Sequence, residues 1–502
     1  MNRRDFIEAV RSCAVLVVAS PWIAKVSFAR AFDSQAVAEL AKTLAAKPFT
    51  PPEPIGEPFA SLGYDQYRDI RYRPELAYWL GEDRGFTLEF MHAGFIYKTP
   101  VRVHIIEDGE LREIQYGSHL FNFGPNLHVP PIHDQPLFSG FRLKAPMDSE
   151  RHDEFLVFQG ASYFRALGAG QLYGASARGV AVDTAEPKGE EFPFFRAFWI
   201  ERPAIQSKTI TIYALLDSLS LTGAFTFHIT PGSSTLMDVE AKLFARREIG
   251  HLGIAPLTSM FFFAQRERRF DDYRTAVHDS DSLAIAQKEG AWIVRPLGNY
   301  RTLQVSSFGD APIRGFGLQQ RSRSFWDYDD LEAHYELRPS MWIEPKDDWG
   351  PGQIELVEIP TGYEFNDNIV AFWRPATPLS AGESRSYAYW LYWGPPVGES
   401  LLARVSSTRS GVAPSGAGHL FVIDFDAPSG KDAPVDWRDI APQVSASVGK
   451  LKNTRGEPNP FTGGYRATFE LDPEGAHLSE LRLLLLKSGK PVSEIWLYRW
   501  TD

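Results

Sequence analysis

Short apolar runs recur along the chain from about residue 64 onward, and clusters of glycine, proline, asparagine and aspartate separate them. Many runs are rich in β-branched and aromatic residues, as in residues 101–106, 209–216 and 386–393. Runs of this length and composition are typical of strands rather than helices. We find no fixed-period repeat, which argues against a propeller or a solenoid. The pattern predicts an all-β protein whose main body is a large antiparallel β-sandwich.

One segment near the N-terminus has helical rather than strand-like spacing. Residues 33–47 place apolar side chains about 3.6 positions apart, and Asp33 or Ser34 supplies a capping side chain. A proline-rich connector, residues 48–59, follows. We therefore expect a single short helix before the first strands.

The amino-acid composition changes at about residue 394. Residues 394–418 are rich in glycine, serine and proline, and five further strand-like runs follow before the C-terminus. Their spacing suits a small immunoglobulin-like sandwich. We expect a large β-sandwich over residues 32–394, a linker over 395–404 and an immunoglobulin-like domain over 405–502. No charged cluster in the last domain suggests chemistry, so a structural or interaction role is expected there.

The first 31 residues resemble an export signal. Arg3 and Arg4 are followed by Phe6, a moderately apolar stretch comes next, and residues 29–31 fit a small-x-small cleavage site. A chance basic N-terminus is the alternative. We expect twin-arginine export to the periplasm and a mature chain that begins at Phe32. No other run is long enough and apolar enough to predict a membrane span.

Charge and cysteine content limit the classes of partner and the chemistry that we expect. The net charge is −11 and no long basic run occurs, so nucleic acid is not an expected partner. The single cysteine, Cys13, lies inside the predicted signal. The mature protein would then lack disulfides, thiolate catalysis and cysteine-ligated metals. Aromatic residues make up 13% of the chain, which fits core packing and sugar stacking equally well.

Three acidic stretches lie within about 95 residues of one another, at 278–282, 324–350 and 364–367. Each one alone is most simply a solvated loop. Together they could supply the two carboxylates of a glycoside hydrolase, one as acid and one as base or nucleophile. Calcium binding by Asp279 and Asp281 is an alternative, but the stretch lacks the glycine and terminal glutamate of an EF-hand. We expect no metal and no other cofactor.

Several long strings resemble one family. They include "YDQYRDIRYRPE" (64–75), "FQGASYFRALGAGQLYGASARGVAVDT" (158–184), "HDSDSLAI" (278–285) and "WIEPKDDWGPGQIELVEIPTGYEFNDNIVAFW" (342–373). From about residue 64 to the C-terminus the chain is similar to the periplasmic glucan biosynthesis proteins, the G and D proteins of osmoregulated periplasmic glucan synthesis. The resemblance implies a galactose-mutarotase-like sandwich joined to an immunoglobulin-like domain. The twin-arginine pattern resembles that of D-type members, which favours the D type.

The resemblance also implies a function and residue roles. Family members act on β-1,2-glucan, and the D type is an inverting endo-β-1,2-glucanase. By motif, Asp367 of "NDN" would be the general acid, with Asn366 and Asn368 orienting it, and the first aspartate of "HDSD", Asp279, the general base. Ser282 stands where the family commonly has glycine, which puts the base in more doubt than the acid.

Further residues complete the predicted site. By the same resemblance, Glu364 belongs to the catalytic group and Tyr335 lines the site. Three other residues are candidate substrate contacts that could equally serve core packing or an ion pair: Arg338, Trp326 and Trp349.

Two other functions stay open. The protein could bind β-1,2-glucan or assist its branching without hydrolysing it, or it could act as a scaffold through its C-terminal domain. Contact with the inner-membrane glucan synthase is a further expected partnership. The segment 321–334 is a candidate lid over the site.

Overall fold

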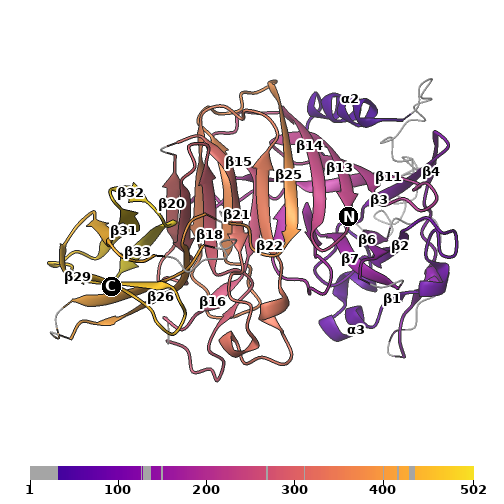
Figure 1. Ribbon diagram of the computed structural model, residues 1–502. Coiled ribbons are helices and arrows are strands. Elements are labelled where there is room, and N and C mark those ends of the chain that lie inside the picture. The colour runs from indigo at the N-terminus through magenta and orange to yellow at the C-terminus, as the bar shows by residue number, and fades with distance from the viewer. Residues whose placement is uncertain are drawn as a thin grey trace, which may run out of the picture.

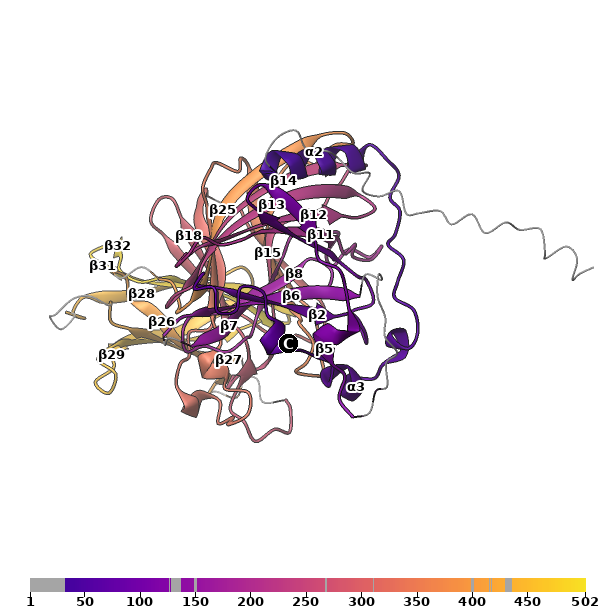
Figure 2. The same ribbon diagram turned by 90° about the vertical axis from the view of Figure 1, so that its right-hand side faces the viewer.

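The computed structural model describes residues 32–502 except 126, 128–136, 149–150, 267–268, 310, 399–400, 415, 417 and 429–435. Strands dominate, and two long sheets pack face to face, as Figures 1 and 2 show. Apart from β3–β11 and β19–β33, the strand pairs recorded in the described residues are antiparallel. The prediction of an all-β, largely antiparallel sandwich is confirmed. The predicted export signal lies outside the described residues.

The first long sheet has ten strands. In spatial order they are β2 (Thr87–His92), β6 (Phe138–Pro146), β7 (His152–Gln159), β8 (Tyr163–Ala166), β9 (Ser176–Arg178), β15 (Leu252–Ser259), β24 (Ile369–Pro375), β23 (Gly352–Glu358) and β20 (Gln304–Phe308), with β10 (Val180–Val182) also paired to β15.

The second long sheet has fifteen strands. Their order is β28 (Ile440–Ala446), β31 (Leu478–Lys487), β33 (Ile495–Thr501), β19 (Trp292–Pro296), β18 (Ser282–Gln287), β21 (Ile313–Gln319), β22 (Ser340–Pro345), β25 (Ser384–Gly394), β14 (Thr235–Ala245), β13 (Leu221–Thr230), β12 (Ile210–Asp217), β11 (Phe194–Glu201), β3 (Arg102–Glu107) and β4 (Glu110–Glu113), with β32 (Lys490–Pro491) beside β31.

Smaller elements complete the fold. A four-stranded sheet contains β26 (Arg404–Val412), β27 (His419–Asp426), β30 (Tyr465–Asp472) and β29 (Lys450–Pro458), and two short pairs are β1 (Arg71–Tyr72) with β5 (Phe121–Asn122) and β16 (Phe261–Phe263) with β17 (Val277–His278). The helices are α2 (Ser34–Ala45), α3 (Tyr64–Arg68) and the 3-10 turns η1 (Phe59–Ser61), η2 (Pro74–Leu76), η3 (Ser118–Leu120), η4 (Phe325–Asp327) and η5 (Tyr335–Leu337).

Helix α2 confirms the one helix predicted from spacing, with Asp33 as its N-cap. It lies across β12, β13 and β14 on the outer face of the sandwich (Figure 2). The Thr222 hydroxyl of β13 donates a hydrogen bond to the Ala41 carbonyl, at 2.7 Å. Since the helix covers the outer face, nearly all of β13 is buried on both sides. The threonines Thr222 and Thr226, which alternate with apolar residues in this strand, are therefore buried as well.

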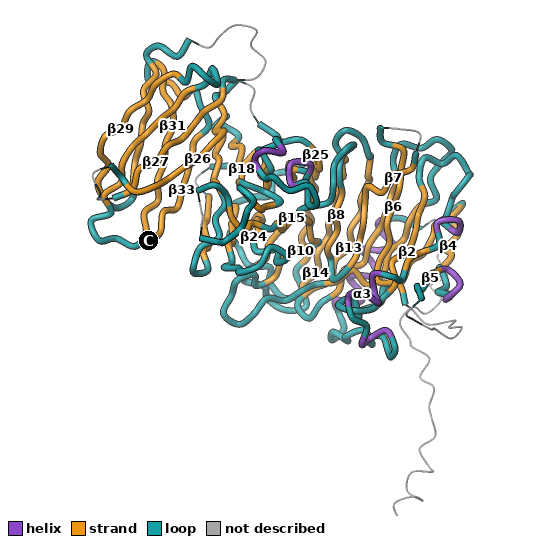
Figure 3. Tube along the Cα trace, turned by 90° about the horizontal axis from the view of Figure 1, so that it is seen from below, coloured by secondary structure: helices purple, strands orange, loops and turns teal. Residues whose placement is uncertain are grey.

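The C-terminal strands are continuous with the large sandwich (Figures 1 and 3). Strand β33 pairs in parallel with β19, where Ile293 faces Ile495 and Val294 faces Trp496. Trp496 is fully buried in a second apolar core that the C-terminal strands enclose. Strand β25 ends at Gly394 and β26 begins at Arg404. The division into two domains at 395–404 stays a prediction, because one sheet crosses it.

Three connections leave the sandwich at the same end. Ser259, the last residue of β15, pairs with Ile369, the first residue of β24. Ser282, which opens β18, pairs with Gln319, which closes β21. The segments 260–281, 320–339 and 359–368 therefore start or finish at one edge of the two sheets. They carry the acidic stretches around Asp279 and Asp367 and the first part of the stretch 324–350. In the described residues, no helix is both long and apolar enough to cross a membrane.

Candidate functional site

Asp279 sits in a buried and fixed position just after β17. Its backbone N–H donates to the Met260 carbonyl at 2.9 Å, and its Oδ1 lies 3.1 Å from Nη1 of Arg338. Burial raises the pKa of Asp279 to about 6; Arg338 acts against this rise and the negative charge of Asp367 adds to it. The structure thus brings the two predicted catalytic aspartates into electrostatic contact.

Arg338 and Tyr335 form the wall around Asp279. Arg338 donates to the carbonyls of Tyr173, at 2.6 Å, and Ala333, at 3.1 Å, which hold its side chain in place. Its guanidinium lies 4.9 Å from the centre of the Tyr335 ring. Tyr335 is buried, and burial, followed by the nearby charges of Glu364 and Asp279, raises its pKa. Both residues therefore lie beside Asp279, and their expected roles in substrate binding stay predictions.

The second aspartate of the "HDSD" stretch has a different role. Asp281 Oδ2 accepts hydrogen bonds from the backbone N–H groups of Arg321, at 2.5 Å, and Ser322, at 3.1 Å. Its Oδ1 accepts from the Ser282 hydroxyl at 2.7 Å. Asp281 thus fixes the turn after β21, whereas no hydrogen bond within the described residues reaches Oδ1 of Asp279. Within the described part of the chain, Oδ1 of Asp279 faces only the guanidinium of Arg338, at 3.1 Å, and Ser282 is accommodated at the start of β18 as a donor to Asp281.

Asp367 lies on a loop whose base is pinned by Asn368. The Asn368 side chain accepts from the Phe261 N–H at 2.8 Å and donates to the Ile359 carbonyl at 3.0 Å. Asn366 donates to the Thr361 hydroxyl at 3.1 Å. The expectation that both asparagines orient the acid directly is wrong, since they brace the loop instead. The recorded partner of the Asp367 carboxylate is Arg165 Nη2, at 3.5 Å, and the side chain is 30% exposed.

Glu364 belongs to an ion-pair cluster that the sequence did not reveal. Its Oε2 lies 2.6 Å from Nη2 of Arg274. The same guanidinium bonds Asp272 through Nε and Nη2, at 3.0 and 2.8 Å, and Asp330 through Nη1, at 3.1 Å. Hydrogen bonds to Asp272, then to Glu364 and Asp330, raise the pKa of Arg274, and burial opposes that rise. Arg274 therefore ties together three loops at the edge of the site, including the candidate lid segment.

Aromatic side chains stand exposed on the same loops. Tyr363 and Phe365 flank Glu364 and stack on each other, with ring centres 5.1 Å apart. Trp326, on the segment that Asp330 ties to Arg274, is 76% exposed. Trp349 is not brought to this group: its Nε1 donates to the Ala388 carbonyl and its ring packs on Trp373, Tyr387 and Tyr389. Of the two tryptophans singled out in the sequence, only Trp326 has a ring that is open to solvent beside the site.

Sequence reasoning did not single out Arg165, Arg274 with its partner Asp272, or the stacked pair Tyr363 and Phe365. Arg165 lies within the string 158–184 that carried the family resemblance, and Arg274 lies four residues before "HDSD". Their chemistry becomes visible only when the fold brings β8 and the three loops together. In the described part of the chain, no group of three or more His, Cys, Asp or Glu side chains is arranged to hold a metal ion. The absence of a cofactor stays a prediction.

Comparison with known proteins decides the family. Residues 32–500 match the family described as "Periplasmic glucan biosynthesis protein, MdoG". The chain belongs to this periplasmic glucan biosynthesis family. Three relatives named "Glucans biosynthesis protein G" are each 44% identical to it. Those of Rhodopseudomonas palustris (strain BisA53) and Bradyrhizobium diazoefficiens align over 100% of both chains. That of Vibrio cholerae (strain O395) aligns over 94% of this chain and 87% of its own.

Membership in the glucan biosynthesis family confirms the resemblance and makes this a protein of periplasmic glucan biosynthesis. The matched region begins at residue 32, where the mature chain was expected to begin. The relatives named above carry the G designation, whereas the twin-arginine pattern favoured the D type. That pattern falls on residues outside the described structure, so the D-type assignment and the export route stay predictions.

Proposed function

We propose that this glucan biosynthesis protein is an inverting endo-β-1,2-glucanase that trims the glucan backbone in the periplasm. In this proposal Asp367 protonates the oxygen of the leaving sugar. Asp279 accepts a proton from the attacking water, directly or through a chain of hydroxyl groups. Inversion requires these two functions to lie on opposite faces of the scissile bond.

The observation that carries the proposal is the setting of Asp279. A buried carboxylate with a pKa near 6 is ionised at neutral pH, yet it binds a proton more tightly than an ordinary aspartate does. Arg338, at 3.1 Å, favours the ionised form and fixes its position. A carboxylate held only for structural reasons would be expected to use both oxygens in hydrogen bonds, as Asp281 does.

Asp367 has the complementary setting. It is partly exposed on a loop at the rim, with Arg165 beside it. A glucan chain lying across this loop would remove the remaining exposed surface from water, and desolvation favours the protonated form that an acid needs. Exposed rings at Tyr363, Phe365 and Trp326 could hold such a chain through the C–H faces of its sugars.

A non-hydrolytic glucan-binding or branching-assistance role is the second candidate. The exposed aromatic rim supports binding whether or not cleavage follows. The names of the relatives refer to glucan biosynthesis and not to hydrolysis. Contact with a membrane-bound glucan synthase would fit either role and stays a prediction.

The deciding experiment measures new reducing ends from linear β-1,2-glucan, with the wild-type protein, Asp367→Asn and the exposed control Asp347→Asn. We expect activity in the wild type and in the control, and a loss of about 10²-fold or more in Asp367→Asn. The anomeric form of the first product, followed by optical rotation, tests inversion. Glucan binding without reducing ends in any variant would establish the second candidate, and full activity in Asp367→Asn would remove this residue from the mechanism.

A further inference from the structure

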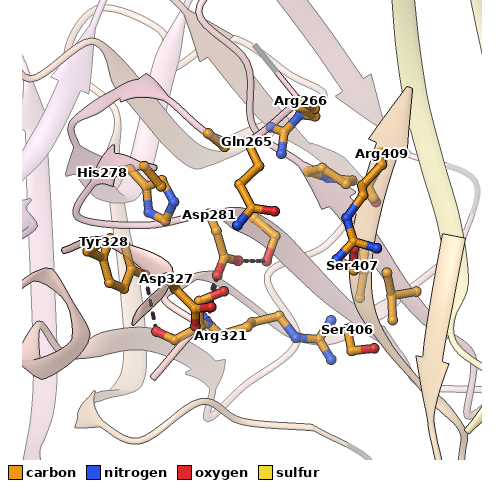
Figure 4. Close-up of a pocket in the computed structure, with 18 residues that line it drawn as sticks. Gln265, Arg266, His278, Asp281, Arg321, Asp327, Tyr328, Ser406, Ser407 and Arg409 are labelled. Carbon is orange, nitrogen blue, oxygen red and sulfur yellow. Dashed lines mark hydrogen bonds between the residues drawn. The ribbon is translucent and has the colours of Figure 1, made fainter. Parts of the chain in front are cut away.

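A second cavity lies outside the proposed site, at the seam between the large sandwich and β26. Its volume is about 180 Å³. The large sandwich contributes residues 264–266 after β16, the end of β17, the start of β18, two residues of β19 and the segment after β21. The C-terminal strands contribute residues 405–409 of β26. Asp279, Glu364 and Asp367 are not among its lining residues. Figure 4 shows its side chains, with Asp327 and Tyr328 on one side and β26 on the other.

The side of the cavity toward β26 carries hydrogen-bond donors. In Figure 4 the guanidinium groups of Arg321 and Arg409 lie on this side, with Ser406 and Ser407 next to them, and Arg266 lies above. These groups come from three separate parts of the chain. The cavity is therefore formed only when the C-terminal strands dock on the large sandwich.

Arg321 has a donor group left over. Its Nη2 bonds both carboxylate oxygens of Glu494, at 3.1 and 2.9 Å. Its Nη1 is buried and has no hydrogen-bond partner among the described residues. Arg404 also lies near Glu494; burial and then the positive charge of Arg321 lower the pKa of Arg404. One carboxylate thus lies near two guanidinium groups, and the buried Nη1 donor of Arg321 has lost its hydrogen bond to water without gaining a replacement from the described residues.

Arg409 also shares its carboxylate with a second arginine. Asp424 accepts from Arg409 Nη1 at 3.0 Å and from Arg466 Nε and Nη2 at 2.6 and 2.9 Å. On the opposite side of the cavity, Asp281 is already engaged by two backbone N–H groups and a serine hydroxyl. Along β26 the arginines therefore outnumber the carboxylates that they share, Glu494 and Asp424, whereas the carboxylates of Asp281 and Asp327 line the opposite side of the cavity.

We propose that this cavity binds a small oxyanion, a phosphate or carboxylate group, held between Arg321, Arg409 and Arg266. A guanidinium fork matches the geometry of both groups, and the hydroxyls of Ser406 and Ser407 supply neutral donors. A neutral sugar would need donors and acceptors in balance, whereas this side of the cavity offers mainly donors. Since the cavity is separate from the carboxylate site, the proposal stands whether or not the protein hydrolyses glucan.

The experiment titrates the full protein with inorganic phosphate by calorimetry at constant ionic strength, which separates binding from general screening. We expect saturable one-to-one binding. Arg409→Gln should weaken it about tenfold, the effect of losing one charge-assisted hydrogen bond. Ser407→Asp, which adds a carboxylate inside the cavity, should weaken it further. Arg466→Gln is the matched control, because Arg466 shares Asp424 but does not line the cavity.

Several results would overturn the oxyanion site. One is the absence of saturable binding to the wild type. Another is equal weakening of phosphate binding in Arg409→Gln and Arg466→Gln, which would mean that the loss comes from the disturbed Asp424 and not from a contact of Arg409 with phosphate. Binding that neither Arg409→Gln nor Ser407→Asp changes would place the phosphate elsewhere. Saturation by glucose in place of phosphate would show that the cavity takes a neutral sugar.

Discussion

Two segments of the chain have the same local structure. One is Asp272–Tyr273–Arg274 at the candidate site, and the other is Asp436–Trp437–Arg438, just before β28 in the C-terminal region. In each, the arginine N–H donates to Oδ1 of the aspartate, at 3.0 and 3.1 Å, and the guanidinium grips the same carboxylate through Nε and Nη2. The surroundings differ. Arg274 also reaches Glu364 and Asp330 on two other loops, whereas Arg438 is exposed on the surface.

This difference shows how the fold turns a local ion pair into a cluster that joins several loops. Local sequence produces the Asp–aromatic–Arg clamp in both places. Only at the end of the large sandwich do neighbouring loops bring further carboxylates, and an exposed aromatic pair, to the same arginine. The C-terminal pairs Arg438–Asp436, Lys452–Asp472 and Arg466–Asp424, in contrast, connect adjacent strands or residues of one turn. The predictions below compare a change at the site with its counterpart in the C-terminal strands.

The largest contrast is expected between Asp279→Asn and Asp424→Asn, which alter buried aspartates paired to arginine in the two regions. Loss of the general base should lower kcat/KM on β-1,2-glucan about 10²–10⁴-fold with the fold intact. Asp424→Asn should cost about 1–3 kcal/mol of unfolding free energy and leave activity unchanged. Reducing-end assays and denaturant unfolding measure both. Equal activities in the two variants would remove the base role from Asp279.

A smaller contrast is expected between Arg274→Gln and Arg438→Gln. Without Arg274 the loop with Glu364 and Asp367 loses its tie to the other loops, and a misplaced acid should lower kcat/KM about tenfold to 10²-fold. Arg438→Gln should keep wild-type kinetics. Arg274→Lys should recover only part of the loss, because an ammonium group cannot form the same fork. Indistinguishable kinetics in Arg274→Gln and Arg438→Gln would mean that the cluster does not position the loop.

The sequence predicted the strands of both regions, since alternation and β-branched composition depend on local burial. Strand β30 alternates strictly between buried and partly exposed residues because one face is in the core. The parallel pairing of β19 with β33 could not be predicted, because it joins residues about 200 positions apart and leaves no local pattern. The contacts of Arg274 with Asp330 and Glu364 were missed for the same reason. Asp279 and Asp367 were found through the family motif; their spacing alone does not distinguish them from loop carboxylates.

A pH effect is expected at the site and not at its C-terminal counterpart. Because burial raises the pKa of Asp279 to about 6, kcat/KM should fall as pH drops below about 6 and protonates the base. Arg338 lowers this pKa, so Arg338→Gln should move the fall to higher pH. Arg438→Gln should leave it in place. The measurement is the pH profile of kcat/KM. If the acidic fall occurs at the same pH in Arg338→Gln as in the wild type, Arg338 does not influence the pKa of the base.

The smallest expected effect is on stability. Asp279 binds its proton more tightly when folded than when unfolded, so it stabilises the fold most below pH 4, and that contribution is lost as pH rises through about 6. The full difference is about 3 kcal/mol at most. Asp279→Asn cannot ionise, so its unfolding free energy relative to the wild type should increase between pH 4 and pH 7. If the difference in unfolding free energy between Asp279→Asn and the wild type were the same at every pH, the carboxylate would not be held in an unfavourable buried setting. The contrast between the two regions would then rest on the loops alone.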